Sequence, residues 1–450
     1  MQRAIFQSLI EWKKSDPHKV LLLRGARQVG KTFVARELGK TFTHFVEVNF
    51  ERDLDTQLFF DQNFDPERIC SSLSAYYGIP IEEKHTLLFF DEIQACPKAI
   101  QALRFFYESK PNLHVIAAGS LLEFALADLS SFGVGRIHSL FMYPMSFDEF
   151  LYAHNEGQLI DLKKQATSEN PLNLTFHNKL TEYLKKFLLT GGMPEVVKTY
   201  LKNSSNPDIV QKGLADIMVS LYDDFVKYKK RSPVLRLREV LDSAIQQAGG
   251  KYIYAKAGEL TNIAQAKEAI DLLEMAGLIH KVYHTSGQGL PMGAGANLKV
   301  FKVLFLDTGL LQQRAGLRLA DFLVAQNTEM LNKGRVAEIF AGLEMIKYEA
   351  AENRPQLYYW HREKRGSNAE VDYLFNDKGT IRPVEIKSGS SGKMQSLYQF
   401  LNERDGSKGI RISMENFGTY DKIDVIPLYA ISNLRLWSSL TSIFPSISLT

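Results

Sequence analysis

The sequence predicts an α/β protein of several domains with a parallel sheet in its N-terminal part. Two apolar segments, 21–23 and 87–90, read as strands buried on both faces, and each is followed by polar loop residues. Further acids and a lysine lie on predicted strands within residues 331–450. A chain of 450 residues has room for more than one hydrophobic core.

The loop after the first strand has the spacing of a phosphate-binding P-loop, Gly25-x-x-x-x-Gly30-Lys31-Thr32. Its glycines let consecutive N–H groups point inward, and the N-terminus of the next helix adds positive potential at the same place. Lys31 is expected to reach the β- and γ-phosphates, and the Thr32 hydroxyl is expected to bind Mg²⁺. The alternative is an ordinary glycine turn. The predicted nucleotide-binding residues are Gly25, Ala26, Arg27, Gln28, Val29, Gly30, Lys31, Thr32 and Phe33.

The second strand, TLLFFD, ends on Asp91, at the edge where ligands bind in open α/β sheets. P-loop proteins hold Mg²⁺ partly through a carboxylate from a neighbouring strand, so Asp91 is the expected metal contact beside Thr32. Glu92 follows and is expected to polarise the attacking water, which predicts hydrolysis rather than binding alone. The alternative is that both acids cap the next helix.

A third strand, 113–120, ends on Ser120, which is expected to sense the γ-phosphate from the neighbouring strand. Arg136, in the turn GVGRIH, is a candidate arginine finger for the nucleotide of its own or a neighbouring subunit. The alternative for Arg136 is a solvated surface arginine.

These motifs, with YPMSFDEFL at 143–151 and GGMPEVV at 191–197, resemble a widespread group of prokaryotic AAA-type ATPases. In that group the ATPase is fused to a C-terminal region of formerly unknown function, and the resemblance covers nearly the whole chain. It implies an ATPase core at 1–145, with ATP and Mg²⁺ as cofactors. An oligomer is possible, and the sequence does not predict its size. The candidate catalytic residues, argued from the motifs above, are Lys31, Glu92, Ser120 and Arg136.

The composition says more about the cellular environment of the protein than about its activity. A net charge of +3 is too small to indicate a nucleic-acid partner by itself. Only Cys70 and Cys96 occur, which excludes a disulfide framework and suits a reducing cytoplasm. The N-terminus lacks the apolar segment of a signal peptide, and no window of about 18 residues is free of charge, so no membrane span is expected.

Residues 146–232 predict a helical lid, because FDEFLYAH, LTEYLKKFLLT and DIMVSLYDDFVKY have apolar residues at i, i+3 and i+4. Between these helices, Gly191-Gly192-Met193-Pro194 predicts a turn whose proline begins the next helix. Such a lid could move with the nucleotide state. A role in packing alone is the alternative.

Residues 233–330 predict a winged-helix module, since helical segments are followed by strands and Gly277 ends the longer helix. In that fold the second helix enters a DNA major groove. Here this helix presents Gln265, Lys267, Glu268 and Asp271, and its two acids support a scaffold role as the alternative.

Residues 331–450 carry a second chemical signal. Glu338 lies on an amphipathic helix, Asp372 on a strand, and Glu385 and Lys387 two positions apart on the next strand, which puts them on one face. The three carboxylates could hold one or two Mg²⁺ ions at a scissile phosphate, and the lysine could steady the attacking hydroxide or the developing charge.

This arrangement resembles the PD-(D/E)xK, or restriction-endonuclease-like, fold, and implies a nuclease-like α/β domain at 331–450. Val371 stands where the proline of the motif is expected. The alternatives are an inactive binding platform and a surface lysine at 387. Aromatic and basic residues ahead of Asp372 could stack on bases and pair with phosphates, although strand packing explains the aromatics equally well: Tyr358, Trp360, His361, Arg362, Lys364 and Arg365.

The predicted function is Mg²⁺-dependent ATP hydrolysis coupled to DNA binding, with the ATPase powering or gating DNA cleavage by the C-terminal domain. The alternative is a non-nucleolytic switch, in which the ATP state controls the lid and a contact with DNA or a regulatory protein. A small-molecule kinase is a third class, but Glu92 and the long multidomain tail argue against it.

Overall fold

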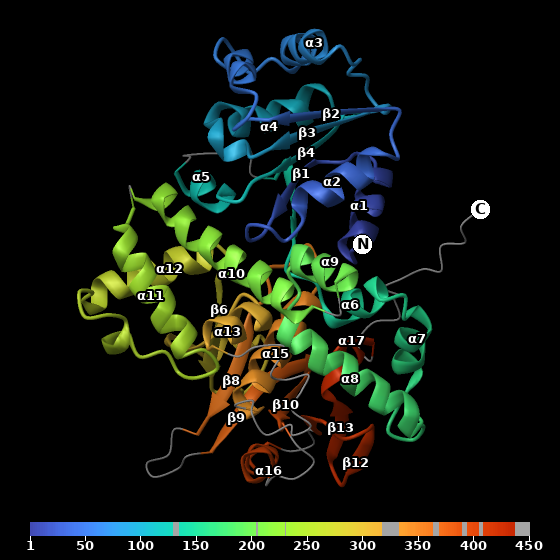
Figure 1. Ribbon diagram of the computed structural model, residues 1–450, viewed down its shortest axis with the longest axis vertical. Helices are drawn as coiled ribbons and strands as arrows, with labels where there is room; N and C mark the ends of the chain where they lie inside the picture. Colours follow the sequence, from blue (N-terminus) through green and yellow to red (C-terminus); the bar gives the residue numbers. More distant parts are fainter. Residues whose placement is uncertain are drawn as a thin grey trace. The chain divides into compact units, whose positions relative to one another are not determined.

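The computed structural model divides into two compact units (Figure 1). The N-terminal unit contains Gln2–Tyr143 and Ala350–Arg354, and the C-terminal unit contains Pro144–Glu349 and the described residues from Pro355 up to 436. Among the described helices, none combines the length and the apolar character that a membrane span requires. The structure describes residues 1–128, 135–203, 206–229, 231–316, 333–362, 369–388, 394–404 and 408–436.

In its described residues, the N-terminal unit is built on a parallel five-stranded sheet with the order β2-β3-β4-β1-β5. This confirms the predicted parallel sheet. One expectation is corrected, because β4 separates the strand that ends at Asp91 from the strand that leads into the P-loop. The elements are α1 (Ile5–Lys14), β1 (Val20–Arg24), α2 (Lys31–Gly39), β2 (His44–Asn49), η1 (Leu54–Phe60), α3 (Pro66–Tyr77), β3 (Thr86–Asp91), η2 (Ile93–Ala95), α4 (Pro97–Ser109), β4 (His114–Ala118), α5 (Leu122–Asp128) and β5 (Ile137–Phe141).

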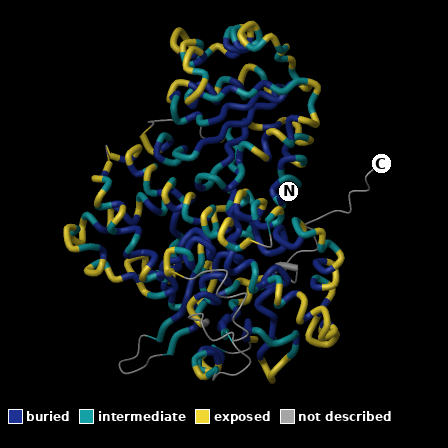
Figure 2. The backbone as a smooth tube through the Cα atoms, in the orientation of Figure 1, coloured by how far each residue is buried: buried dark blue, intermediate teal, exposed yellow. Residues whose placement is uncertain are grey.

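Alternate side chains of these strands face opposite layers of helices. Leu22, Leu88 and Phe90 belong to a buried cluster that includes Leu73 of α3 and Phe106 of α4. Helices α1 and α2 lie on the other face of the sheet (Figure 1). The strands are dark blue in Figure 2, and every residue of β3 is buried. Burial on both faces explains why these strands read as continuous apolar runs rather than as alternating patterns.

Two stacked histidines are buried beside this sheet. The rings of His18 and His114 are 3.8 Å apart with an interplanar angle of 11°, and Trp12 meets both edge-on. Burial lowers the pKa of both imidazoles, to about 4 for His114, where the neighbouring His18 lowers it further. In the unfolded chain the same groups titrate near 6.5. The N-terminal unit therefore folds around two neutral imidazoles.

This pair makes stability depend on pH in a defined direction. The folded pKa lies below the unfolded value, so the contribution is complete above about pH 6.5 and is lost as pH falls from there toward about 4. Between pH 7.5 and 5.0, His114 alone is expected to cost about 2 kcal/mol of unfolding free energy. Urea unfolding at both pH values measures it. A smaller pH dependence in His114→Phe is expected, and an unchanged one would contradict this assignment.

The C-terminal unit combines helices with a mixed sheet, and the helices predicted as a lid, α6 to α10, belong to it. Its elements are α6 (Phe147–Ala153), α7 (Gly157–Gln165), α8 (Leu174–Thr190), α9 (Pro194–Lys202), α10 (Pro207–Asp223), η3 (Asp224–Tyr228), α11 (Val234–Gln246), η4 (Tyr254–Lys256), α12 (Ile263–Met275), β6 (Ile279–Thr285), η5 (Met292–Gly295), β7 (Ala296–Phe305), α13 (Thr308–Arg314), α15 (Lys333–Lys347), β8 (Leu357–His361), β9 (Glu370–Asp377), β10 (Thr380–Ile386), α16 (Gln395–Asn402), β11 (Gly409–Ser413), β12 (Gly418–Tyr420), β13 (Ile423–Pro427), η6 (Leu428–Ala430) and α17 (Asn433–Leu436).

The β6–β7 hairpin, which the sequence assigns to the winged-helix module, is part of the same sheet as the strands predicted for the nuclease-like domain. In the described residues this sheet has eight strands in the order β12-β13-β11-β10-β9-β8-β6-β7. β6 pairs with β7 in antiparallel fashion and with β8 in parallel. The hairpin therefore extends the sheet, and the predicted boundary at 330/331 lies between elements that share it.

Helix α12 makes contacts within its own unit through several residues that the sequence offered for DNA. Gln265 closes a capping box with Asn262. Lys267 Nζ lies 5.7 Å from the ring centroid of Tyr254. Asp271 accepts a 2.5 Å hydrogen bond from Lys281 of β6. These contacts give three polar residues of the helix an intramolecular role.

The segment Gly191–Gly192 packs against a buried acid of the same unit. Asp307 caps α13 by accepting from Gly309 N at 2.9 Å, and its other oxygen accepts from Gly192 N at 2.7 Å. Gly191 has φ +69°, and a Cβ there would lie 1.9 Å from Asp307 Oδ1. Pro194 then begins α9. The glycines of this segment are therefore required by close packing and by backbone geometry.

Candidate functional site

The P-loop begins where β1 ends. Gly25 has φ +138° and Gly30 has φ +100°, a region that favours glycine. A Cβ on Gly25 would lie 2.0 Å from the carbonyl oxygen of Met142, so the loop can pass this backbone only without a side chain. The loop ends at Gly30, directly before the first residue of α2. Its N–H groups therefore gather at a helix N-terminus, the arrangement that binds phosphate.

Lys31 is folded onto the loop itself. Its Nζ donates to the carbonyl oxygens of Gly25 and Ala26, both at 2.8 Å. Burial lowers its pKa to about 8, while the nearby acids Glu92 and Asp91 oppose that shift. The side chain therefore remains mainly cationic at neutral pH. Phosphate oxygens of a nucleotide would replace the two carbonyl contacts.

Thr32 and Asp91 meet at the carboxyl edge of the sheet. The Thr32 hydroxyl donates to Asp91 Oδ2 at 3.0 Å, and Glu92 N donates to Asp91 Oδ1 at 3.1 Å. Burial raises the pKa of Asp91, as does the adjacent Glu92. A hydroxyl and a carboxylate this close are oxygen donors of the kind that Mg²⁺ prefers, so these two residues fit a Mg²⁺ contact.

Glu92 is held in an unusual conformation by two neighbours. It has φ +49°, and its side chain caps no helix, unlike the alternative considered from sequence. Its Oε2 accepts from Gln94 Nε2 at 2.6 Å and from Ser120 N and Oγ, both at 3.3 Å. Ser120 thus contacts the acid expected to polarise water. Strained backbone of this kind is concentrated at functional sites.

Gln94 is a site residue that the motif analysis did not find. A Cβ on Gly119 would lie 1.9 Å from Gln94 Oε1, so Gly119 provides the space that the amide needs to reach Glu92. The only signal in the sequence is the short spacing from Glu92 to Gln94, followed by a glycine before Ser120.

Arg136 lies away from the P-loop. It directly precedes β5, whose first residue Ile137 pairs with Val20, whereas the P-loop follows the other end of β1. Its guanidinium forms an ion pair with Glu108 near the C-terminus of α4. This placement corrects the expectation that Arg136 contacts the γ-phosphate of its own subunit. A contact with a neighbouring subunit remains a prediction.

The second set of predicted site residues comes together on the mixed sheet. Asp372 Oδ2 accepts from Ile386 N at 2.8 Å, which joins β9 to the end of β10. Lys387 Nζ lies 2.6 Å from Glu385 Oε1. Burial raises the pKa of both carboxyls, and of Glu338 on α15.

A lysine that the sequence analysis did not consider lies inside this cluster. Lys302 Nζ of β7 is 2.7 Å from Glu338 Oε1, 2.7 Å from Glu370 Oε1 and 3.8 Å from Asp372 Oδ1. Burial alone lowers the pKa of Lys302, but the surrounding carboxylates outweigh it and the net shift is upward. The sequence signal is a lysine inside the apolar strand KVFKVLF.

The predicted three-carboxylate Mg²⁺ site does not fit this arrangement. The ammonium of Lys302 pairs with Oε1 of Glu338 and lies 3.8 Å from Asp372 Oδ1, so it occupies the space between these two carboxylates. Within the described ranges, no group of three or more His, Cys, Asp or Glu side chains is placed to hold a metal ion. The carboxylates are balanced by lysines instead.

The aromatic and basic residues ahead of Asp372 are used in packing where the structure describes them. Trp360 is buried and meets Phe400 edge-on at 5.3 Å. Arg362 forms an ion pair of 2.7 Å with Glu403. The predicted phosphate contacts Lys364 and Arg365 lie outside the described residues.

Likenesses to solved structures are distant. A Walker-type ATPase of Pyrococcus abyssi is 16% identical over 69% of this chain and 94% of its own, with a TM-score of 0.43. The Orc1 protein of Aeropyrum pernix, solved in complex with DNA, is 14% identical over 71% and 92%, with a TM-score of 0.27. Cdc6p of Pyrobaculum aerophilum is 12% identical over 69% and 89%, with a TM-score of 0.26. No curated protein matches the chain.

Family matches divide the chain in three. Residues 181–321 and 333–431 match two families described as domains of unknown function, DUF8612 and DUF4143. Residues 17–151 match the AAA domain family, and they contain the P-loop, Asp91 and Glu92 described above. The N-terminal part of the chain is therefore an AAA-type P-loop ATPase domain.

Proposed function

We propose that the chain hydrolyses ATP with Mg²⁺ in its N-terminal unit. The observation that carries this proposal is the hydrogen bond of 3.0 Å between Thr32 and Asp91, with Glu92 one residue further on. Residues suited to a metal ion and a residue suited to an attacking water then lie together beside the P-loop. A protein that only bound ATP would need no acid at the position of Glu92.

Each residue has a distinct task in this proposal. The N–H groups of the P-loop and the ammonium of Lys31 bind the phosphates, and Thr32 and Asp91 hold the Mg²⁺. When bound, the Mg²⁺ neutralises charge on the phosphate oxygens. Glu92 accepts a proton from the attacking water, and the contacts from Gln94 and Ser120 keep its carboxylate in place.

We further propose that ATP turnover drives a switch coupled to DNA or to a regulatory protein. A nuclease role is supported by the convergence of Glu338, Asp372 and Glu385 in the C-terminal unit. The buried ammonium of Lys302 among them favours the non-nucleolytic alternative. A winged-helix contact with DNA through α12 and an arginine finger from Arg136 in a neighbouring subunit stay part of this proposal.

The test is phosphate release from ATP by the wild-type chain and by Lys31→Ala, with Mg²⁺ and with excess EDTA. Wild type with Mg²⁺ is expected to turn over ATP, and EDTA is expected to abolish it. Because Lys31 neutralises phosphate charge, its loss is expected to lower kcat by about 10²–10³-fold. Equal turnover by Lys31→Ala would contradict the proposal.

The same assay with duplex or single-stranded DNA separates the two kinds of partner. A change in kcat that weakens as salt rises would support a DNA-coupled switch, because phosphate contacts are salt-dependent. A turnover that neither DNA alters would favour a protein partner.

A further inference from the structure

The acidic cluster of the C-terminal unit, formed by Glu338, Glu370, Asp372 and Glu385, already contains a cation. The Lys302 ammonium is within 2.7 Å of a carboxylate oxygen on α15 and of another on β9, those of Glu338 and Glu370. It is 3.8 Å from Asp372 Oδ1, also on β9. An ammonium and a divalent cation compete for the same carboxylate oxygens and repel each other.

Lys302 is fixed in this position. Its side chain is 3% exposed, and its Nζ lies 5.0 Å from the ring centroid of Tyr359. Its backbone pairs with Val282 in the β6–β7 hairpin. Withdrawing the ammonium would leave the half-buried carboxylates of Glu338 and Asp372 without their counter-charge, which is unfavourable.

One carboxylate oxygen of the cluster has no hydrogen-bond partner among the described residues. It is the buried Oε2 of Glu385, a residue that is 7% exposed. Its Oε1 is paired with Lys387. The cluster therefore keeps an acceptor for positive charge beyond Lys302 and Lys387, although Lys302 lies among its carboxylates.

We propose that Lys302 is the resident cation of this cluster and that it excludes divalent cations from the wild-type chain. Removing its ammonium frees carboxylate oxygens of Glu338 and Asp372, and a divalent cation then draws these two side chains and Glu385 into a site that the wild-type arrangement does not form. A strand lysine then stands where the predicted nuclease-like site would hold its metal ion. This inference does not depend on ATP hydrolysis by the other unit.

Mn²⁺ binding, measured as the loss of the free-ion signal in electron paramagnetic resonance, tests the proposal. All chains carry Asp91→Asn, which silences the expected metal contact of the N-terminal unit. With Lys302 intact, no saturable site is expected up to about 1 mM Mn²⁺. Lys302→Met is expected to add one site, which a further Glu338→Gln removes. Lys251→Met is the matched control, because Lys251 pairs with Glu370 at 3.2 Å from a 40% exposed position and should add none.

Two outcomes overturn the proposal. One is a saturable Mn²⁺ site in the chain that keeps Lys302, if adding Glu338→Gln to that chain removes the site. The other is a Lys302→Met chain with an unchanged circular-dichroism spectrum that binds no Mn²⁺. The first measurement needs no substitution at Lys302, so the proposal stays testable if Lys302→Met does not fold.

Discussion

Glu92→Gln is expected to lower ATP turnover by about 10²–10⁴-fold while ATP binding stays close to wild type. The amide keeps the shape of the side chain and can still be held by Gln94 and Ser120, which contact Oε2 of the acid. It cannot accept a proton from water. The measurement is kcat from phosphate release, together with the Kd of ATP from calorimetry.

Glu37→Gln is the matched control for this substitution. Glu37 lies on α2, the helix that follows the P-loop, and its carboxylate pairs with Lys40 at the surface. Its turnover should stay within about twofold of wild type, because an exposed pair of this kind contributes little. If Glu92→Gln and Glu37→Gln behaved alike, Glu92 would have no role in the chemistry.

The P-loop could be read from the sequence because its function depends on local backbone geometry. Glycines at 25 and 30 with Lys31 and Thr32 determine one loop conformation, and a motif records such geometry directly. The hydrogen bond from Gln94 to Glu92 could not be predicted from the sequence. It depends on a positive φ at Glu92 and on the space left by Gly119. No periodicity or composition encodes those two conditions.

Strand order and the place of Arg136 depend on pairing between distant segments. β1 pairs with β4 and β5, although β2 and β3 come before them in the chain. An apolar run predicts a buried strand but does not indicate which other strand pairs with it. The residue type of Arg136 makes it a candidate arginine finger, whereas its distance from the P-loop follows from the parallel register of β5 with β1.

The acidic cluster around Lys302 also depends on pairing between distant segments. Alternation along β10 was enough to expect Glu385 and Lys387 on one face. Lys302 lies among these carboxylates because β7 pairs with β6, and β6 pairs in parallel with β8 of the same sheet. A prediction that divides the chain at 330 separates Lys302 from its carboxylates. The charge balance of the cluster can be predicted only if the β6–β7 hairpin and the strands after residue 330 are placed in one sheet.

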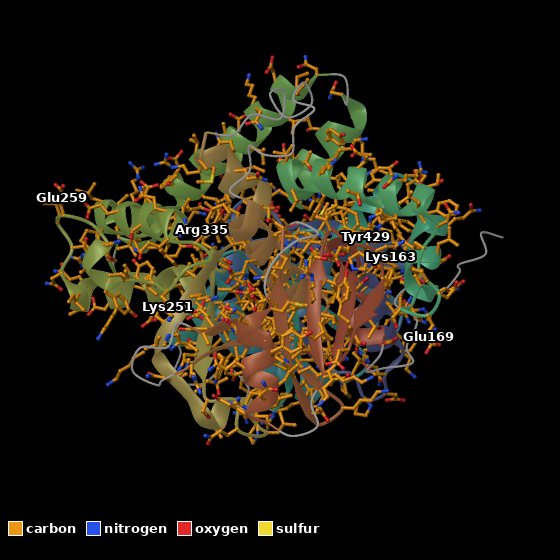
Figure 3. All side chains as sticks on the ribbon, turned by 90° about the horizontal axis from the view of Figure 1, so that it is seen from below. Lys163, Glu169, Lys251, Glu259, Arg335 and Tyr429 are labelled. Atoms are coloured by element: carbon orange, nitrogen blue, oxygen red, sulfur yellow. The ribbon has the colours of Figure 1, made fainter. Side chains whose placement is uncertain are left out.

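A second buried ion pair is expected to have the largest effect on stability. Lys163 of α7 and Asp148 of α6 form an ion pair, and their side chains are 0% and 2% exposed. Lys163 also donates to Ser432 Oγ at 2.8 Å, and it lies beside Tyr429 in Figure 3. The pair joins α6 to α7, and the hydrogen bond to Ser432 joins these helices to the C-terminal end of the described chain.

Lys163→Met is expected to lower the free energy of unfolding of the C-terminal unit by about 3–5 kcal/mol. The substitution leaves the Asp148 carboxylate buried without its counter-charge. Urea unfolding followed by circular dichroism measures the loss. Lys179→Met, which removes a half-exposed lysine paired with Glu156, should cost about 1 kcal/mol or less.

The double variant Asp148→Leu with Lys163→Met separates loss of the pair from an orphaned charge. Replacing both partners by apolar side chains removes the buried carboxylate as well as the ammonium, so most of the lost stability should return. Ser432 loses its donor in both variants, so its contribution cancels between them. If the double variant were as unstable as Lys163→Met alone, the cost would come from packing around α7 rather than from an unpaired acid.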